Sequence, residues 1–181
     1  MSHKPIWYIK ELPTEFCDKA VEEFSQVAPK DAGMGQSGER KDLTQRNTTV
    51  RFINPGHWFS YIMHGVAREA NLACKWHYDI TGQENIQFAE YGVDQHYDWH
   101  VDVFPLGEQG LDRKVSVVCL LSDPSEFEGG EFEVKLYGLY KAPLKKGSVI
   151  AFPSILEHRV TPVTSGLRRS ATVWMNGPRF K

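Results

Sequence analysis

Residues 85–104, NIQFAEYGVDQHYDWHVDVF, decide the fold class of this chain. Two β-rich runs stand on either side of a turn at Gly92, and the second run alternates apolar and polar side chains. Such alternation is typical of a half-buried strand. Short runs of similar character follow, separated by turn signals: 114–121, 131–137, 148–152, 157–163 and 168–175. We therefore predict a β-sandwich or barrel from residue 85 onward.

Two amphipathic segments precede this β-rich half. Residues 14–28 predict a helix with Thr14 as its N-cap and Pro29 as its stop, and residues 57–73 predict a second helix. Together the pattern predicts a mainly β jelly roll packed against two or more N-terminal helices. Residues 30–49 predict a long loop, which is either a solvated charged segment or, together with residues 75–85, a frame for the substrate.

Composition narrows the class of protein. The chain has 181 residues, 41% of them apolar, which fits one globular domain. Its net charge of −2 gives no reason to expect a nucleic-acid partner. Three widely spaced cysteines predict neither a disulfide framework nor a cysteine zinc site. Without an apolar leader or a membrane-length apolar run, we expect no membrane association and a cytoplasmic location.

His100 and Asp102 lie one residue apart in the second run, so the predicted strand places both on one face. Tyr97 and Trp99 are expected to point to the opposite face and to pack against a helix. Two histidines and one carboxylate form a common site for iron(II) that leaves coordination positions open. The pair alone fits a solvated strand face better than a metal site. His158, which follows another strand and a short turn, offers the third ligand.

Arg168 comes ten residues after His158, on a further predicted strand. A guanidinium group suits bidentate capture of a carboxylate, as a carboxylate-bearing cosubstrate near a metal would require. Ser170 and Thr172 share the strand face of Arg168 and could add hydroxyl donors. Trp174 lies on the same face and serves either as core packing or as a wall of the pocket.

With these residues, the chain resembles the iron(II)/2-oxoglutarate-dependent dioxygenases of the prolyl 4-hydroxylase-like group. The family pattern is HxD, a distal histidine, and an arginine or lysine ten residues later, with a tyrosine nine residues before the first histidine. The matching segments are YGVDQHYDWHVD (91–102), LLSDPSEFEGGEF (120–132), GSVIAFPS (147–154) and HRVTPVTSGLRRSATVW (158–174). Asp94 departs from the pattern, because many members have a glycine there, and we expect only a changed turn.

The resemblance implies a double-stranded β-helix fold and roles for individual residues. His100, Asp102 and His158 would bind Fe(II). Arg168 would bind the distal carboxylate of 2-oxoglutarate, with Tyr91 donating its hydroxyl to the same group. The cosubstrates would be 2-oxoglutarate and O2, with ascorbate as a candidate additional factor.

The function that this resemblance implies is hydroxylation of a C–H bond, with succinate and CO2 as co-products. The expected substrate is a prolyl residue in a peptide or protein. Two alternatives stay open: a hydroxylase of a free amino acid or other small molecule, and a non-catalytic metal-binding jelly-roll module. We predict one domain over 1–181, with helical support and substrate loops in 1–84 and the catalytic jelly-roll core in 85–181.

Overall fold

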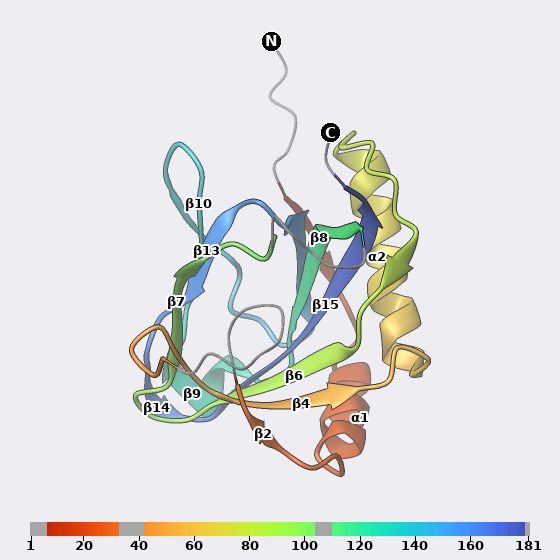
Figure 1. The fold of residues 1–181 in the computed structure, drawn as a ribbon. Coiled ribbons are helices and arrows are strands. Elements are labelled where there is room, and N and C mark those ends of the chain that lie inside the picture. Colours follow the sequence, from red (N-terminus) through yellow and green to blue (C-terminus); the bar gives the residue numbers. More distant parts are fainter. Residues whose placement is uncertain (1–6, 33–41, 104–109, 180–181) are drawn as a thin grey trace.

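The computed structural model describes residues 7–32, 42–103 and 110–179. Two antiparallel sheets face each other, and both helices cover the outer face of the larger sheet (Figure 1). The larger sheet has the strand order β1-β12-β8-β15-β6-β4-β2, with β5 paired to β15. The smaller sheet has the order β11-β10-β13-β7-β3, and β14 pairs with β9. This architecture agrees with the predicted jelly roll packed against helices.

The strands of the larger sheet are β1 (Tyr8–Glu11), β2 (Lys30–Asp31), β4 (Thr49–Ile53), β5 (Gly82–Gln83), β6 (Ile86–Tyr91), β8 (Leu111–Leu120), β12 (Ser148–Pro153) and β15 (Arg168–Pro178). Those of the smaller sheet are β3 (Arg46–Asn47), β7 (His96–His100), β10 (Phe132–Lys135), β11 (Leu139–Lys141) and β13 (Glu157–Val160). The short pair is β9 (Phe127–Gly129) and β14 (Val163–Gly166), and a single 3-10 turn, η1, spans Pro124–Glu126.

Strand β15 shows how the larger sheet separates two environments. Ala171, Val173 and Met175 are fully buried against the helices, within the first of two apolar clusters. Successive side chains of a strand point to opposite faces, so Arg168, Ser170, Thr172 and Trp174 point between the two sheets. The second apolar cluster fills that interior. The sequence pattern of β15 therefore builds a core on one face and a polar site on the other.

Helix α1 spans Thr14–Phe24 and α2 spans Trp58–Ala73. The predicted helix over 14–28 is therefore too long, and Thr14 is the first helical residue. Its predicted N-cap role is wrong, because Pro13 occupies that position without a side-chain cap. After Phe24 the backbone continues in turns, in which the Val27 N–H donates to the Phe24 carbonyl. The Nε of Arg51 donates to the Val27 carbonyl at 2.8 Å. Helix α2 begins after His57, whose Nδ1 accepts from the Phe59 N–H at 3.3 Å.

The predicted loop over 30–49 was only partly correct. Residues 33–41 lie outside the described part of the chain, so the role of this segment in framing a substrate stays a prediction. Its ends form β2 and β3, which join the two different sheets. Strands β1 and β4 were also missed, since both are short and lie outside the β-rich half. No helix within the described ranges is long and apolar enough to cross a membrane.

Candidate active site

The structure brings His100, Asp102 and His158 together in one cluster, with the two histidines on adjacent strands of the smaller sheet. Their potential ligand atoms all lie within 4.8 Å of one another, and no other such cluster of His, Cys, Asp or Glu occurs in the described ranges. His100 Nε2 lies 3.7 Å from Asp102 Oδ1, and His158 Nε2 lies 3.4 Å from Asp102 Oδ2. His100 ends β7 and pairs directly with His158 on β13, so adjacent strands carry the two imidazoles.

Backbone carbonyls fix the tautomer of both imidazoles. The Nδ1 of His100 lies 2.7 Å from the Asp98 carbonyl, and the Nδ1 of His158 lies 2.9 Å from the Leu156 carbonyl. A carbonyl oxygen only accepts, so each Nδ1 carries the proton and donates it. Each Nε2 therefore keeps its lone pair and is available as a ligand, as expected of metal-binding histidines.

The charges of the three groups favour a bound cation. Burial, together with the neighbouring His158, lowers the pKa of His100 to about 3, so this imidazole is neutral at physiological pH. Burial alone would raise the pKa of Asp102, but His158 outweighs it through charge attraction and a hydrogen bond, and the pKa lies well below its ordinary value. Burial lowers the pKa of His158, whereas Asp102 raises it by a larger amount. The carboxylate is thus ionised and partnered by an imidazole.

The predicted reason for this convergence needs correction. Strand β7 ends at His100, so Asp102 lies beyond the strand and its direction is not set by strand alternation. Instead, the Asp102 N–H donates to the Ser154 carbonyl at 3.0 Å, which ties this segment to the end of β12. The two residues converge as predicted, but a tertiary hydrogen bond orients the second one.

The predicted packing of Tyr97 was also wrong. Strand alternation from His100 places Tyr97 on the opposite face, yet its ring stacks on the His100 imidazole with centroids 3.5 Å apart and planes at 9°. The cause is an irregularity between β7 and β13, where Asp98 and Trp99 of β7 lie opposite the single residue Arg159 of β13. An extra residue in a strand reverses which face the following side chains occupy. Trp99 contacts Arg159 of β13, at 4.6 Å from the ring centroid, and not a helix as predicted.

Arg168 lies at the start of β15, directly opposite Tyr91 on β6. Its side chain is 2% exposed, and burial lowers its pKa. Its Nη1 donates to Ser170 Oγ at 3.0 Å and its guanidinium carbon lies 5.4 Å from the Tyr91 ring centroid. Its Nε has no hydrogen-bond partner in the described structure. A buried cation with an unused donor is costly unless an anion binds it.

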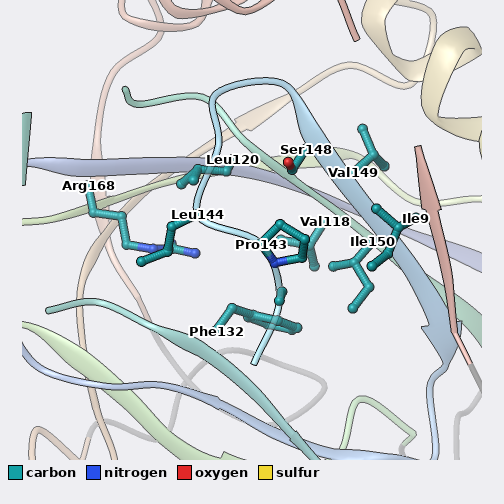
Figure 2. A pocket seen from close by; sticks show the side chains of 11 residues that line it. Ile9, Val118, Leu120, Phe132, Pro143, Leu144, Ser148, Val149, Ile150 and Arg168 are labelled. Atoms are coloured by element: carbon teal, nitrogen blue, oxygen red, sulfur yellow. The ribbon is translucent and has the colours of Figure 1, made fainter. Parts of the chain in front are cut away.

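A pocket opens beside this guanidinium. Arg168 lies at one end and Ile9 near the other, with Phe132, Pro143 and Leu144 between them (Figure 2). About 340 Å³ of its space is free of protein atoms, part of it open to solvent. Its walls are mainly aliphatic, so a short hydrocarbon chain that ends in a carboxylate would match both the walls and Arg168.

The other predicted cosubstrate residues lie near Arg168 or further along the same face. Tyr91, Ser170 and Thr172 are buried on the interior side of the larger sheet. Trp174 is 7% exposed, and its Nε1 has no partner within the described residues. Arg113 stacks on its ring at 3.8 Å and pairs with Glu84 at 2.6 Å. Trp174 is thus covered by a charged side chain and is not enclosed in an apolar core.

Sequence reasoning missed several neighbours of the triad. Ser116 donates to Asp102 Oδ2 at 2.6 Å, and its hydroxyl lies 2.9 Å from that of Ser154. The only signal for Ser116 was a polar residue in the otherwise apolar run VSVVCLL of β8. Arg113 gave no signal, because an irregularity near Lys114 turns it toward Trp174. Bulges beside active sites often redirect a side chain in this way.

These residues fit iron(II) and a dicarboxylate cosubstrate. Two imidazole Nε2 atoms and one carboxylate form a donor set that suits non-haem iron. The orphaned Nε of the buried Arg168 offers a separate anchor for a carboxylate. Residues 86–176 match the family model described as the 2OG-Fe(II) oxygenase superfamily. The chain belongs to this superfamily.

Curated relatives of this oxygenase match only part of their own length. A PKHD-type hydroxylase of Pseudoalteromonas atlantica is 35% identical over 94 residues, which cover 49% of this chain and 41% of that protein. The chain thus spans less than half the length of this relative. The resemblance to 2-oxoglutarate dioxygenases that was inferred from the motif is confirmed.

Solved structures confirm the predicted jelly-roll fold. A Pseudomonas putida prolyl-4-hydroxylase has a TM-score of 0.73 at 19% identity, covering 99% of this chain and 95% of that chain. A prolyl hydroxylase from Trichoplax adhaerens, solved with a hypoxia inducible factor peptide fragment, has a TM-score of 0.73 at 16% identity. That match covers 94% of this chain and 83% of the other. At these identities the likeness concerns the fold.

Proposed function

We propose that this oxygenase hydroxylates a substrate C–H bond in a reaction that depends on Fe(II), 2-oxoglutarate and O2. One observation carries the proposal. A cluster of two histidines and one aspartate shares the interior between the sheets with a buried arginine whose Nε lacks a partner. The first element suits the metal and the second suits the distal carboxylate of the cosubstrate. A protein without this reaction has no need for both.

Within this proposal, His100, Asp102 and His158 hold Fe(II). When bound, the metal and 2-oxoglutarate supply the oxidation, in which one oxygen atom of O2 enters the substrate and the other enters succinate as CO2 leaves. The protein contributes the geometry. Proton donation from each Nδ1 to a backbone carbonyl keeps both imidazoles in the ligating tautomer.

Arg168 binds the distal carboxylate of the cosubstrate. Its bond to Ser170 fixes the guanidinium, and the ring of Tyr91 lies beside it with its hydroxyl as a second donor. Thr172 lies further along the same strand face, and Trp174 forms a wall of the site. The apolar interior around these groups excludes water, which strengthens each charged contact.

We propose a prolyl residue of a peptide or protein as the substrate. The fold likeness to prolyl hydroxylases supports this class, and one of those structures holds a peptide fragment. The exposed edge of the triad, where His100 keeps 13% of its side-chain surface, leaves room for a substrate from solvent. A free amino acid or another small molecule is the second candidate. Three free, buried cysteines suit a reducing compartment, and we propose the cytoplasm as its location.

The proposal is tested by measuring succinate formation with Fe(II), 2-oxoglutarate and a panel of proline-containing peptides, alongside free proline. We expect succinate formation that depends on all cosubstrates, and a mass gain of one oxygen atom in a peptide. Oxygen gain in free proline alone would overturn the peptide substrate but leave the chemistry intact. Bound iron and 2-oxoglutarate without turnover of any substrate would instead favour a non-catalytic metal-binding module.

A further inference from the structure

Two buried serines lie behind the carboxylate of Asp102. Ser116 is in the middle of β8 and Ser154 directly follows β12, and both are fully buried. The Oγ of Ser116 lies 2.6 Å from Asp102 Oδ2 and 2.9 Å from the Oγ of Ser154. Neither serine is among the potential metal ligands. They are nonetheless the hydroxyl groups that connect this carboxylate to two strands of the larger sheet.

The available protons fix the direction of the hydrogen bonds that link Ser154, Ser116 and Asp102. An ionised carboxylate only accepts hydrogen bonds, so Ser116 must donate to Asp102. A serine hydroxyl has a single proton, and Ser116 has thereby used it. In the bond between the two hydroxyls, Ser154 is therefore the donor and Ser116 the acceptor. The order of donation is Ser154 to Ser116 to Asp102 Oδ2.

Backbone bonds hold the same three segments in register. The Asp102 N–H donates to the Ser154 carbonyl at 3.0 Å, and the Ser154 N–H donates to the Lys114 carbonyl at 3.1 Å. Since Asp102 lies past the end of β7, these contacts replace the strand ladder that would otherwise orient it. The backbone bonds position the residue, while the hydroxyl chain sets the rotation of its carboxylate.

We infer that Ser116 and Ser154 are positioning residues that fix the rotation of the Asp102 carboxylate, so that it faces the metal site between His100 and His158. The inference rests on the proposed function, because it concerns the same metal site. Oδ1 lies 3.7 Å from His100 Nε2, while Oδ2 lies 3.4 Å from His158 Nε2 and accepts from Ser116, so the bond to Ser116 holds the carboxylate plane with one oxygen toward each imidazole. Hydrogen bonds behind a ligand fix its orientation, and their loss typically weakens metal binding roughly 10- to 100-fold.

The test measures the dissociation constant for Co(II), from its visible absorption, with the full chain and four variants. We expect Ser116→Ala to bind roughly 10- to 100-fold more weakly, while Ser116→Thr, which keeps the donor, stays close to wild type. Ser154→Ala should weaken binding to a smaller extent. Because Ser154 acts through Ser116, the double alanine variant should bind no more weakly than Ser116→Ala alone. This non-additivity distinguishes a directed chain from two independent structural contacts.

Ser122→Ala is the matched control. Ser122 is also buried, and it follows β8, but its hydroxyl donates to the Leu167 carbonyl and not to the triad. It should lower the melting temperature without changing the Co(II) constant. Equal Co(II) constants for wild type and Ser116→Ala would overturn the inference while leaving the metal site intact. Failure of the wild type to bind Co(II) would overturn the proposed function itself. If Ser116→Ala does not fold, an unchanged constant in Ser154→Ala overturns the inference.

Discussion

Gly130 provides a sharp test of how the fold positions Arg168. This glycine has a φ of +59°, and a Cβ built on it would lie 2.7 Å from Arg168 Cδ and 3.0 Å from Val163 Cγ2. Ordinary contact begins near 3.4 Å, so Arg168 Cδ would have to retreat by about 0.7 Å (3.4 minus 2.7). Its guanidinium, held by Ser170, would then leave its present position. Gly130→Ala should therefore impair both stability and carboxylate binding.

A control variant separates the cost of the left-handed backbone from the cost of the close contact with Arg168. Gly110 has a similar φ of +70°, but no atom of the described residues lies within 4 Å of its added Cβ. A left-handed backbone costs a non-glycine residue about 1–2 kcal/mol, which both alanine variants share. Overpacking adds about 1–3 kcal/mol at Gly130 alone. We thus expect Gly130→Ala to lower the free energy of unfolding by about 2–5 kcal/mol, and Gly110→Ala by about 1–2 kcal/mol.

Urea unfolding measures the free energy of unfolding, and titration with 2-oxoglutarate in the presence of Mn(II) measures the affinity for this cosubstrate. Because sub-ångström displacement of a binding group has large effects, we expect about 10-fold weaker binding in Gly130→Ala. Gly110→Ala should bind 2-oxoglutarate like the wild type. Equal destabilisation of the two variants, together with equal affinity for 2-oxoglutarate, would show that close packing at Gly130 does not position Arg168.

Arg168→Lys should weaken 2-oxoglutarate binding at least about 10-fold, because lysine lacks the planar pair of donors. Arg169→Lys is the control, since the Arg169 side chain pairs with Glu90 and Glu126, and it should bind 2-oxoglutarate like the wild type. Titration of both variants with 2-oxoglutarate checks this. Burial raises the pKa of Tyr97 from 10.0 to about 12, so the unfolded chain ionises first and stability falls as pH rises between these values. Urea unfolding across that range should show a smaller loss in Tyr97→Phe, and an identical loss would contradict the assignment. All three cysteines are buried, so a thiol reagent should label none in the folded protein and three in denaturant; rapid labelling of the native state would show that a buried thiol is accessible.

The metal cluster was predictable because it depends on residue types at long sequence separations. His100, Asp102, His158 and Arg168 were recognised from their order and spacing, and the structure brings the first three within 4.8 Å. Their arrangement was only partly predictable. Alternation would have placed Tyr97 away from His100, but an extra residue in β7 brings it onto the imidazole. A bulge depends on pairing with a distant strand, which a local pattern does not encode.

The supporting residues were harder to find for a related reason. In the sequence, Ser116 is a single polar residue within an apolar strand and Ser154 directly follows another. Their link to Asp102 becomes visible only when β8, β12 and the segment after β7 are assembled. Arg113 meets Trp174 through a second irregularity in strand pairing. Helix α1 was overestimated because apolar periodicity continues to residue 28, whereas Arg51 from β4 takes the Val27 carbonyl. The treatment of residues 1–181 as one domain stays a prediction.

Iron stoichiometry decides whether His100, Asp102 and His158 form one iron site. Under anaerobic conditions, the wild-type chain should bind one Fe(II), and His100→Ala and Asp102→Ala should each lose it. His64→Ala, which removes a histidine of α2 that contacts Gln83 at 2.8 Å, should retain it. Unchanged iron stoichiometry in both His100→Ala and Asp102→Ala would show that these residues do not form the iron site.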